Sequence, residues 1–125
     1  MKLNPDCVRD ILLTVEDLTG YNQHFTYPSE NCPRLEQYTP EEVKYHFCQC
    51  GKADFIEIDT TIDDSFEVYD LTPAGHEFIA NIRKDSFFSK VKDICKELGL
   101  SSLKDIAHIS TNASALIIKS YFDIS

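Results

Sequence analysis

Lysine and arginine are scarce in the first two thirds of this 125-residue sequence. Residues 1–80 contain five Lys or Arg and 16 Asp or Glu, a local net charge of −11, whereas residues 81–125 contain seven and five, a net charge of +2. A protein that holds nucleic acid through its phosphates needs clustered Lys and Arg. The shortage therefore argues against sequence-independent DNA binding by residues 1–80, although it leaves room for a small basic face.

Long apolar runs are also missing. The longest apolar-leaning segment, Ala113 to Phe122, is interrupted by Lys119 and is shorter than the ~20 residues that a membrane-spanning helix needs. The sequence turns polar at Asn4, where a secretory signal would begin its apolar core. These two absences predict a cytoplasmic protein without a membrane segment.

Catalytic motifs are absent as well. The four histidines lie in no recognisable nucleophile motif, and the acidic residues lack the Asp-x-Asp-x-Asp-Gly spacing of a calcium loop. We therefore predict that the protein is not an enzyme and needs no cofactor. The histidines are His24, His46, His76 and His108.

The five cysteines are scattered and odd in number, which predicts reduced thiols rather than a disulfide framework. One metal-like cluster, residues 46–50 with the sequence HFCQC, stands out. On a helix, His46 and Cys50 would share a side while Cys48 points away, and a fourth ligand would have to be Cys32 or His76. The sequence therefore favours small buried thiols beside a hydrogen-bonded histidine, and no metal site.

The best-marked stretch that is present runs from Phe66 to Arg83 and predicts a strand followed directly by a helix. Thr72 can cap that helix, and Pro73 suits its first position because proline lacks an N–H that would need a partner there. Gly75 would let the helix sit close to whatever it covers. The apolar face would consist of Phe78, Ile79 and Ile82.

The remaining elements are read from caps and periodicity. A first helix begins at Asn4-Pro5 and ends by Gly20, and a short strand is possible at residues 24–27. Thr39 and Glu42 have the spacing of a capping box, which predicts a second helix over 39–50. Alternating residues predict a β-hairpin over 55–71, followed by the helix over 73–84. Two or three further helices are expected: one from Asp85 or Ser86 to Gly99, one from Ser101 or Ser102, and, if there is a third, one from Thr111 or Asn112.

This order predicts a mainly helical α+β protein with a winged-helix-like core over residues 1–84 and a helical extension over 85–125, together one domain. A helix-turn-helix normally has two helices between the first helix and the wing. Here only residues 39–50 are evident, so the motif is incomplete unless residues 32–37 hold a turn of helix.

Three blocks resemble a known family. They are MKLNPDCVRDILL (residues 1–13), YTPEEVKYH (38–46) and LTPAGHEFIANIR (71–83). Together they are similar to a domain-of-unknown-function family of phage, prophage and mobile-element proteins from Gram-positive bacteria. The resemblance implies a phage-associated context in the bacterial host cytoplasm and a winged-helix-like fold, and it supplies no catalytic or ligand-binding residue.

The hairpin provides the leading functional hypothesis. Between Phe55 and Leu71 there is no Lys or Arg, but there are six carboxylates: Glu57, Asp59, Asp63, Asp64, Glu67 and Asp70. Such a surface would repel DNA and attract a basic protein surface. We therefore predict a non-enzymatic regulator or modulator of a host or phage protein, although a charge run is also commonly just a solvated face.

A DNA-binding winged-helix transcription regulator is the alternative. Its reading helix would present Lys44, Tyr45, Gln49 and Lys52, and a glutamine can pair with adenine. The C-terminal helices leave two further alternatives open: their surplus apolar surface either forms a homodimer or packs on the first helix. Any residual nucleic-acid contact belongs on their basic residues, Arg83, Lys84, Lys90, Lys92 and Lys96.

Overall fold

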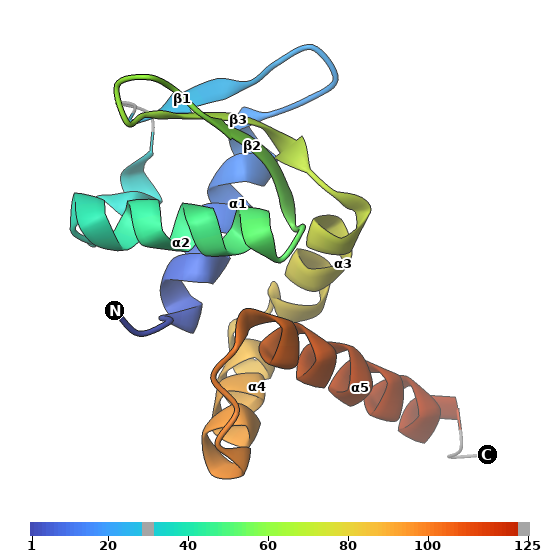
Figure 1. Ribbon diagram of the computed structural model, residues 1–125. Coiled ribbons are helices and arrows are strands. Elements are labelled where there is room, and N and C mark those ends of the chain that lie inside the picture. The colour runs from blue at the N-terminus through green and yellow to red at the C-terminus, as the bar shows by residue number, and fades with distance from the viewer. Residues whose placement is uncertain (29–31, 123–125) are drawn as a thin grey trace. The chain divides into compact units, whose positions relative to one another are not determined.

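The computed structural model describes residues 1–28 and 32–122 of the chain. These residues form five α-helices, one 3-10 helix and three β-strands, so the predicted mainly helical α+β class is confirmed (Figure 1). The chain divides into two compact units, Met1–His76 and Glu77–Ser125, each of which is described by itself.

The first unit begins with helix α1, Pro5–Leu18. The Asn4 side chain caps it by accepting a hydrogen bond from the Asp6 N–H at 3.0 Å, as the Asn-Pro start predicts. The predicted apolar stripe is buried and includes Val8, Ile11, Leu12 and Val15. This helix is therefore a core element.

Helix α2, Pro40–Lys52, starts with the predicted capping box. The Glu42 N–H donates to Thr39 Oγ1 and the Thr39 N–H donates to Glu42 Oε1, both at 3.2 Å. The helix continues two residues past the predicted end at residue 50. Gly51 lies inside it because α2 is pressed against the sheet there: a Cβ at Gly51 would lie 2.8 Å from Ile58 Cγ2.

The sheet of the first unit consists of β1 (Phe25–Tyr27), β2 (Ile56–Thr60) and β3 (Phe66–Leu71), in the order β1-β3-β2 and antiparallel throughout. The predicted hairpin is thus β2 and β3, and the predicted strand at 24–27 is β1. Between β1 and α2 lies η1, a 3-10 helix over Pro33–Leu35 with Leu35 buried. It supplies the short helical turn that the sequence left open at residues 32–37.

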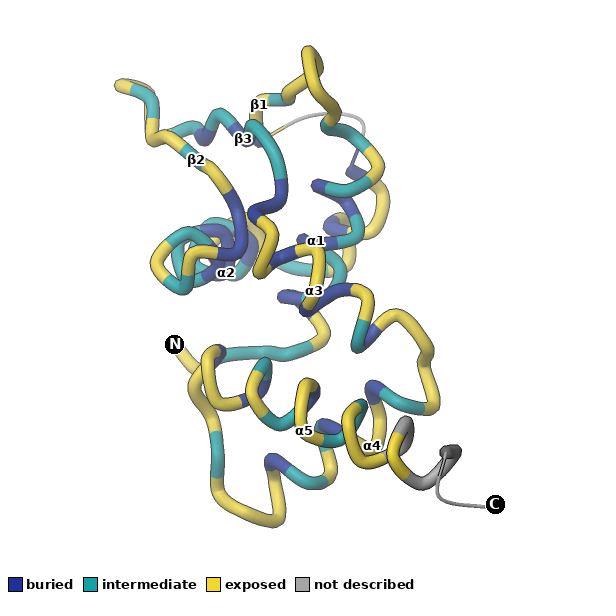
Figure 2. Tube along the Cα trace, turned by 90° about the vertical axis from the view of Figure 1, so that its right-hand side faces the viewer, coloured by how far each residue is buried: buried dark blue, intermediate teal, exposed yellow. Residues whose placement is uncertain are grey.

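The core of the first unit lies where α1 and α2 meet the sheet. Helix α1 contacts β3, α2 contacts β2, and the two helices contact each other. Phe47 is fully buried. The centroid of its ring lies 5.2 Å from the ring centroid of Tyr27 and 5.9 Å from that of Phe66. Buried positions therefore gather along α1, α2 and β3 (Figure 2).

Helix α3, Pro73–Ile82, has the predicted cap. Thr72 Oγ1 accepts from the Gly75 N–H at 3.0 Å and donates to the Asp54 carbonyl at 2.6 Å. Gly75 meets the backbone directly, because a Cβ there would lie 2.0 Å from the Phe55 carbonyl oxygen. The helix ends at Ile82, two residues before the predicted end at 84.

The second unit contains α4 (Asp85–Leu98) and α5 (Leu103–Phe122), which contact each other. Helix α4 ends as predicted at Gly99, which has a left-handed φ of 71°. Among the described residues, two helices follow α3, the lower of the two expected numbers, because α5 is continuous through Thr111 and Asn112. The Ser110 and Thr111 hydroxyl groups both donate to the Ala107 carbonyl oxygen in the preceding turn of the same helix. They therefore do not cap a new helix.

Candidate functional site

The acidic hairpin, residues 55–71, places four of its six carboxylates in two opposed pairs. The strand register sets Asp59 directly opposite Glu67 and Glu57 directly opposite Asp70. Like charges facing each other across two strands are destabilising. The fold therefore keeps a concentrated negative charge on this hairpin at a cost to its own pairing.

Tyr69 lies between one of these pairs. Its hydroxyl is 2.9 Å from Glu67 Oε2 and 3.1 Å from Asp59 Oδ2. The hydrogen bonds to Glu67 and then to Asp59 raise the pKa of Tyr69 to about 12. A register shift between Glu57 and Ile58 leaves Tyr69 as the extra residue of β3, which is why Glu57 faces Asp70 and not the tyrosine.

This bridge gives a testable titration. We expect the Tyr69 phenolate to remain a minor species at about pH 11, because its pKa is raised to about 12. Substituting Glu67→Gln removes the carboxylate whose hydrogen bond contributes most to this shift. The pKa of Tyr69 should then fall toward the ordinary tyrosine value of about 10. The measurement is the phenolate absorbance of each protein after subtraction of the matching Tyr69→Phe spectrum. Glu57→Gln is the control, since Glu57 does not bond to Tyr69, and an unchanged titration in Glu67→Gln would contradict the bridge.

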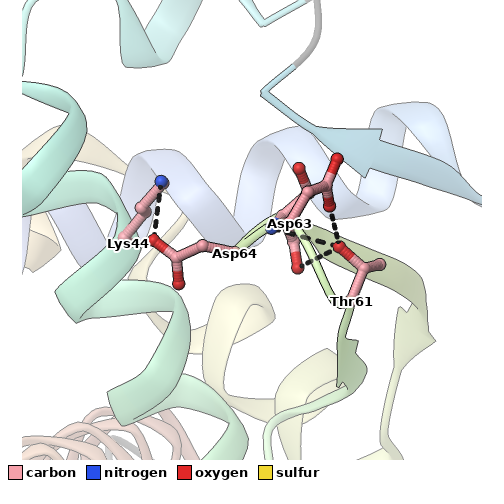
Figure 3. A network of polar contacts seen from close by, with 5 residues as sticks. Lys44, Thr61, Asp63 and Asp64 are labelled. Carbon is pink, nitrogen blue, oxygen red and sulfur yellow. Dashed lines mark hydrogen bonds and ion pairs between the residues drawn. The ribbon is translucent and has the colours of Figure 1, made fainter.

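The turn of the hairpin holds the other two carboxylates (Figure 3). The Thr61 hydroxyl donates to Asp63 Oδ1, and this bond, followed by one from Ser65, lowers the pKa of Asp63. Asp64 has a left-handed φ of 63°, a conformation that aspartate tolerates in turns. Its Oδ2 accepts from Lys44 Nζ of α2 at 3.1 Å, so an ion pair ties the turn to the helix.

The four residues of the predicted DNA-reading helix lie on α2 in different surroundings. Lys44 belongs to the acidic turn through its ion pair with Asp64, and the Tyr45 ring packs edge-on against the His46 ring at 5.0 Å. Gln49 is half-buried, and Lys52 is exposed in the last turn. Lys44, which was predicted to read DNA, is thus ion-paired with the acidic hairpin, which was predicted to bind protein.

A groove of about 590 Å³ lies beside β2. Every residue of β2 lines it, and α2 contributes Cys48, Gly51 and Lys52. Glu57 and Asp59 add two exposed carboxylates to this lining. Tyr69 also lines the groove, so the tyrosine-bridged pair Asp59 and Glu67 stands at its border.

The histidine of the predicted metal-like cluster is a structural residue. His46 is fully buried, its Nε2 accepts from the Asn4 N–H at 2.8 Å, and its Nδ1 lies 2.6 Å from the Glu42 carbonyl. These contacts fit a neutral ring that donates from Nδ1, and they link the start of α1 to α2. Burial raises the pKa of the Cys50 thiol strongly, which keeps it protonated.

The surroundings of this cluster do not assemble a ligand set. Within residues 1–28 and 32–122, no group of three or more His, Cys, Asp or Glu is arranged to hold a metal ion. Burial, followed by the nearby charges of Glu42 and Asp10, raises the pKa of Cys7 to about 12. The buried thiols of Cys7 and Cys50 are therefore protonated packing groups of the first unit.

Sequence reasoning missed Tyr69 as a site residue and Lys44 as a partner of the acidic turn. The spacing Glu67-x-Tyr69 places both side chains on one face of a strand, which was a usable signal. The pairing with Asp59 depended on the hairpin register, and the Lys44–Asp64 contact joins residues 20 positions apart. Neither follows from local periodicity.

The structure therefore defines a mainly helical α+β protein with a small antiparallel sheet, whose hairpin bears six carboxylates. Residues 2–101 match the family described as "Hypothetical protein (DUF2513)". Since this match spans most of the sequence, the chain belongs to that family, and the predicted resemblance to a family of unknown function is confirmed. Comparisons with curated proteins and with solved structures found no match.

Among the described residues, none of the helices combines the length and apolar character that crossing a bilayer requires.

The homodimer hypothesis named Ile118, Tyr121 and Phe122, whose side chains lie outside the described part of the structure. Of the other residues it named, Phe88 is buried, Phe87 is half-buried and Leu116 is 67% exposed.

Proposed function

We propose that this protein acts by binding another protein and that the acidic hairpin forms the contact surface. The partner presents a basic surface, because residues 55–71 offer six carboxylates and no Lys or Arg. The sequence resemblance to phage and prophage proteins favours a host or phage protein as this partner, with the chain acting as its regulator or modulator.

The groove beside β2 is the observation that carries this proposal. In the strand order β1-β3-β2, β2 is an edge strand, and the groove follows its whole length. Edge strands offer unpaired N–H and C=O groups to an incoming extended segment. The Thr61 N–H bonds to the Ser65 carbonyl, so the antiparallel alternation directs the backbone groups of Ile58 and Thr60 toward the open edge. A basic extended segment would find hydrogen bonds here and the carboxylates of Glu57 and Asp59 beside them.

The test is capture of partners from bacterial lysate by the tagged full chain, with and without nuclease. We expect a stoichiometric protein that survives nuclease and whose affinity falls by about tenfold or more in Glu57→Gln/Asp59→Asn, because two exposed groove charges are lost. The same affinity should fall as salt is raised.

The matched control is Glu36→Gln/Glu41→Gln, which removes two exposed carboxylates from the same unit outside the hairpin. Equal losses in the two double variants would show that net charge, and not the hairpin, attracts the partner. An unchanged affinity of the partner for the hairpin variant Glu57→Gln/Asp59→Asn would refute the proposal.

A DNA-binding winged-helix regulator is the second candidate, and the element order favours it. Both η1 and α2 stand between α1 and the hairpin of β2 and β3, and two helical segments at this place are what a helix-turn-helix would need. Against DNA reading, Lys44 is paired with Asp64 and the wing bears no basic residue. If DNA is the ligand, Lys44→Glu/Lys52→Glu should abolish binding of duplex DNA in a fluorescence-anisotropy titration, and the captured material should be lost after nuclease.

A further inference from the structure

The second unit contains a pocket of about 630 Å³ that plays no part in the proposed function. It is lined by the end of α3, the link to α4, the first turns of α4 and one residue of α5. Its size lies within the range of about 300–1,000 Å³ typical of small-molecule sites.

The charge of this pocket is opposite to that of the protein. Arg83, Lys84 and Lys90 line it, and none of its described lining residues is acidic, although the chain has a net charge of −9. All three cationic residues are exposed, so a dissolved ligand can reach them. Three positive charges on one concave surface favour a ligand with several negative charges, such as a di- or triphosphate group.

The rest of the lining includes an aromatic side chain and hydroxyl groups, which could contact parts of a ligand other than its phosphates. The Phe87 side chain is half-buried and forms part of the wall, so an aromatic group stands beside the three cations. Ser86 and Ser114 bring two hydroxyl groups. Asn81 also lines the pocket, and its Nδ2 lies 3.5 Å from Thr111 Oγ1, a contact that links α3 to α5 beside the site.

We propose that this pocket binds a nucleoside di- or triphosphate. The phosphates lie against Arg83, Lys84 and Lys90, and the base stacks on Phe87. The hydroxyl groups of Ser86 and Ser114 are placed to bond the sugar or the base. An inorganic phosphate would use the cations but would leave the aromatic wall without a partner.

The test is a calorimetric titration of the full chain with ATP, ADP, GTP and inorganic tripolyphosphate at low salt. We expect saturable nucleotide binding that weakens by about tenfold or more in Arg83→Gln/Lys84→Gln/Lys90→Gln. The control Lys96→Gln/Lys104→Gln/Lys119→Gln removes the same charge from exposed residues of the same unit and should change affinity by less than about threefold. Far-UV circular dichroism of each variant checks that the helices remain.

The Phe87→Leu variant distinguishes the contribution of the base to binding from that of the phosphates. It should weaken ATP and leave tripolyphosphate unchanged, because only the nucleotide has a base to stack. Three results would overturn the proposal: no saturable binding of any nucleotide at up to about 5 mM, equal losses in the two triple variants, or tripolyphosphate binding as tightly as ATP with no effect of Phe87→Leu. None of them depends on the acidic hairpin, which lies in the other unit.

Discussion

Substituting Gly75→Ala should lower the free energy of unfolding of the first unit by about 3 kcal/mol or more. The added Cβ would lie 2.0 Å from the Phe55 carbonyl oxygen, so one of the two backbones must move. Phe55 is held in place, because its carbonyl accepts from the Thr72 N–H and its own N–H donates to the Cys50 carbonyl, both at 3.0 Å. Relief of the clash therefore breaks the junction between α2, the hairpin and α3.

Gly20→Ala is the matched control for this change. Nothing lies within 4 Å of a Cβ at Gly20, so its free energy of unfolding should change by less than about 0.5 kcal/mol. Urea denaturation followed by circular dichroism compares the two variants. If Gly75→Ala unfolds at the wild-type urea concentration, the close approach of α3 to Phe55 is not present in solution.

Phe47→Ala should cost about 3–5 kcal/mol, because it removes a fully buried aromatic ring and leaves a cavity. The ring contacts Tyr27 of β1 and Phe66 of β3, so it connects α2 to two strands of the sheet. A loss of this size is a large part of the ~5–15 kcal/mol that stabilises an ordinary domain. The variant should therefore unfold at a much lower urea concentration, or fail to fold at all.

Tyr21→Ala provides the comparison for Phe47→Ala. Tyr21 is also aromatic but is fully exposed, at 100%. Its removal should change the free energy of unfolding by no more than about 0.5 kcal/mol. Similar losses at both positions would mean that Phe47 is not in a packed core.

Helix starts were predictable because a cap acts over three or four residues. Asn4, Thr39 and Thr72 all cap the helices that follow them, and each stands directly before a proline. Helix ends were less predictable. The second helix was predicted to end at residue 50, but α2 continues through Gly51, where a Cβ would lie only 2.8 Å from Ile58 Cγ2.

The acidic composition of the candidate site was predictable from the sequence, but the arrangement of its side chains was not. The absence of Lys and Arg from residues 55–71 is enough to identify an acidic hairpin from the sequence. The opposed pair Asp59 and Glu67 and the bridge from Tyr69 depend on the register and on the bulge in β3. The basic residues of the second unit were likewise recognised as a face, whereas the pocket lined by Arg83, Lys84 and Lys90 depends on three helices meeting.

The sequence by itself therefore determined the class of fold, most helix starts and the sign of the charge on each part of the chain. These properties are set by neighbouring residues, since caps, periodicity and local charge act within a few positions. Only the tertiary structure decided that Lys44 pairs with Asp64, that Gly75 faces the Phe55 carbonyl and that β2 is an edge strand of the described sheet. Each of these depends on packing between segments distant in sequence, where shape and register, rather than local preference, select the contact.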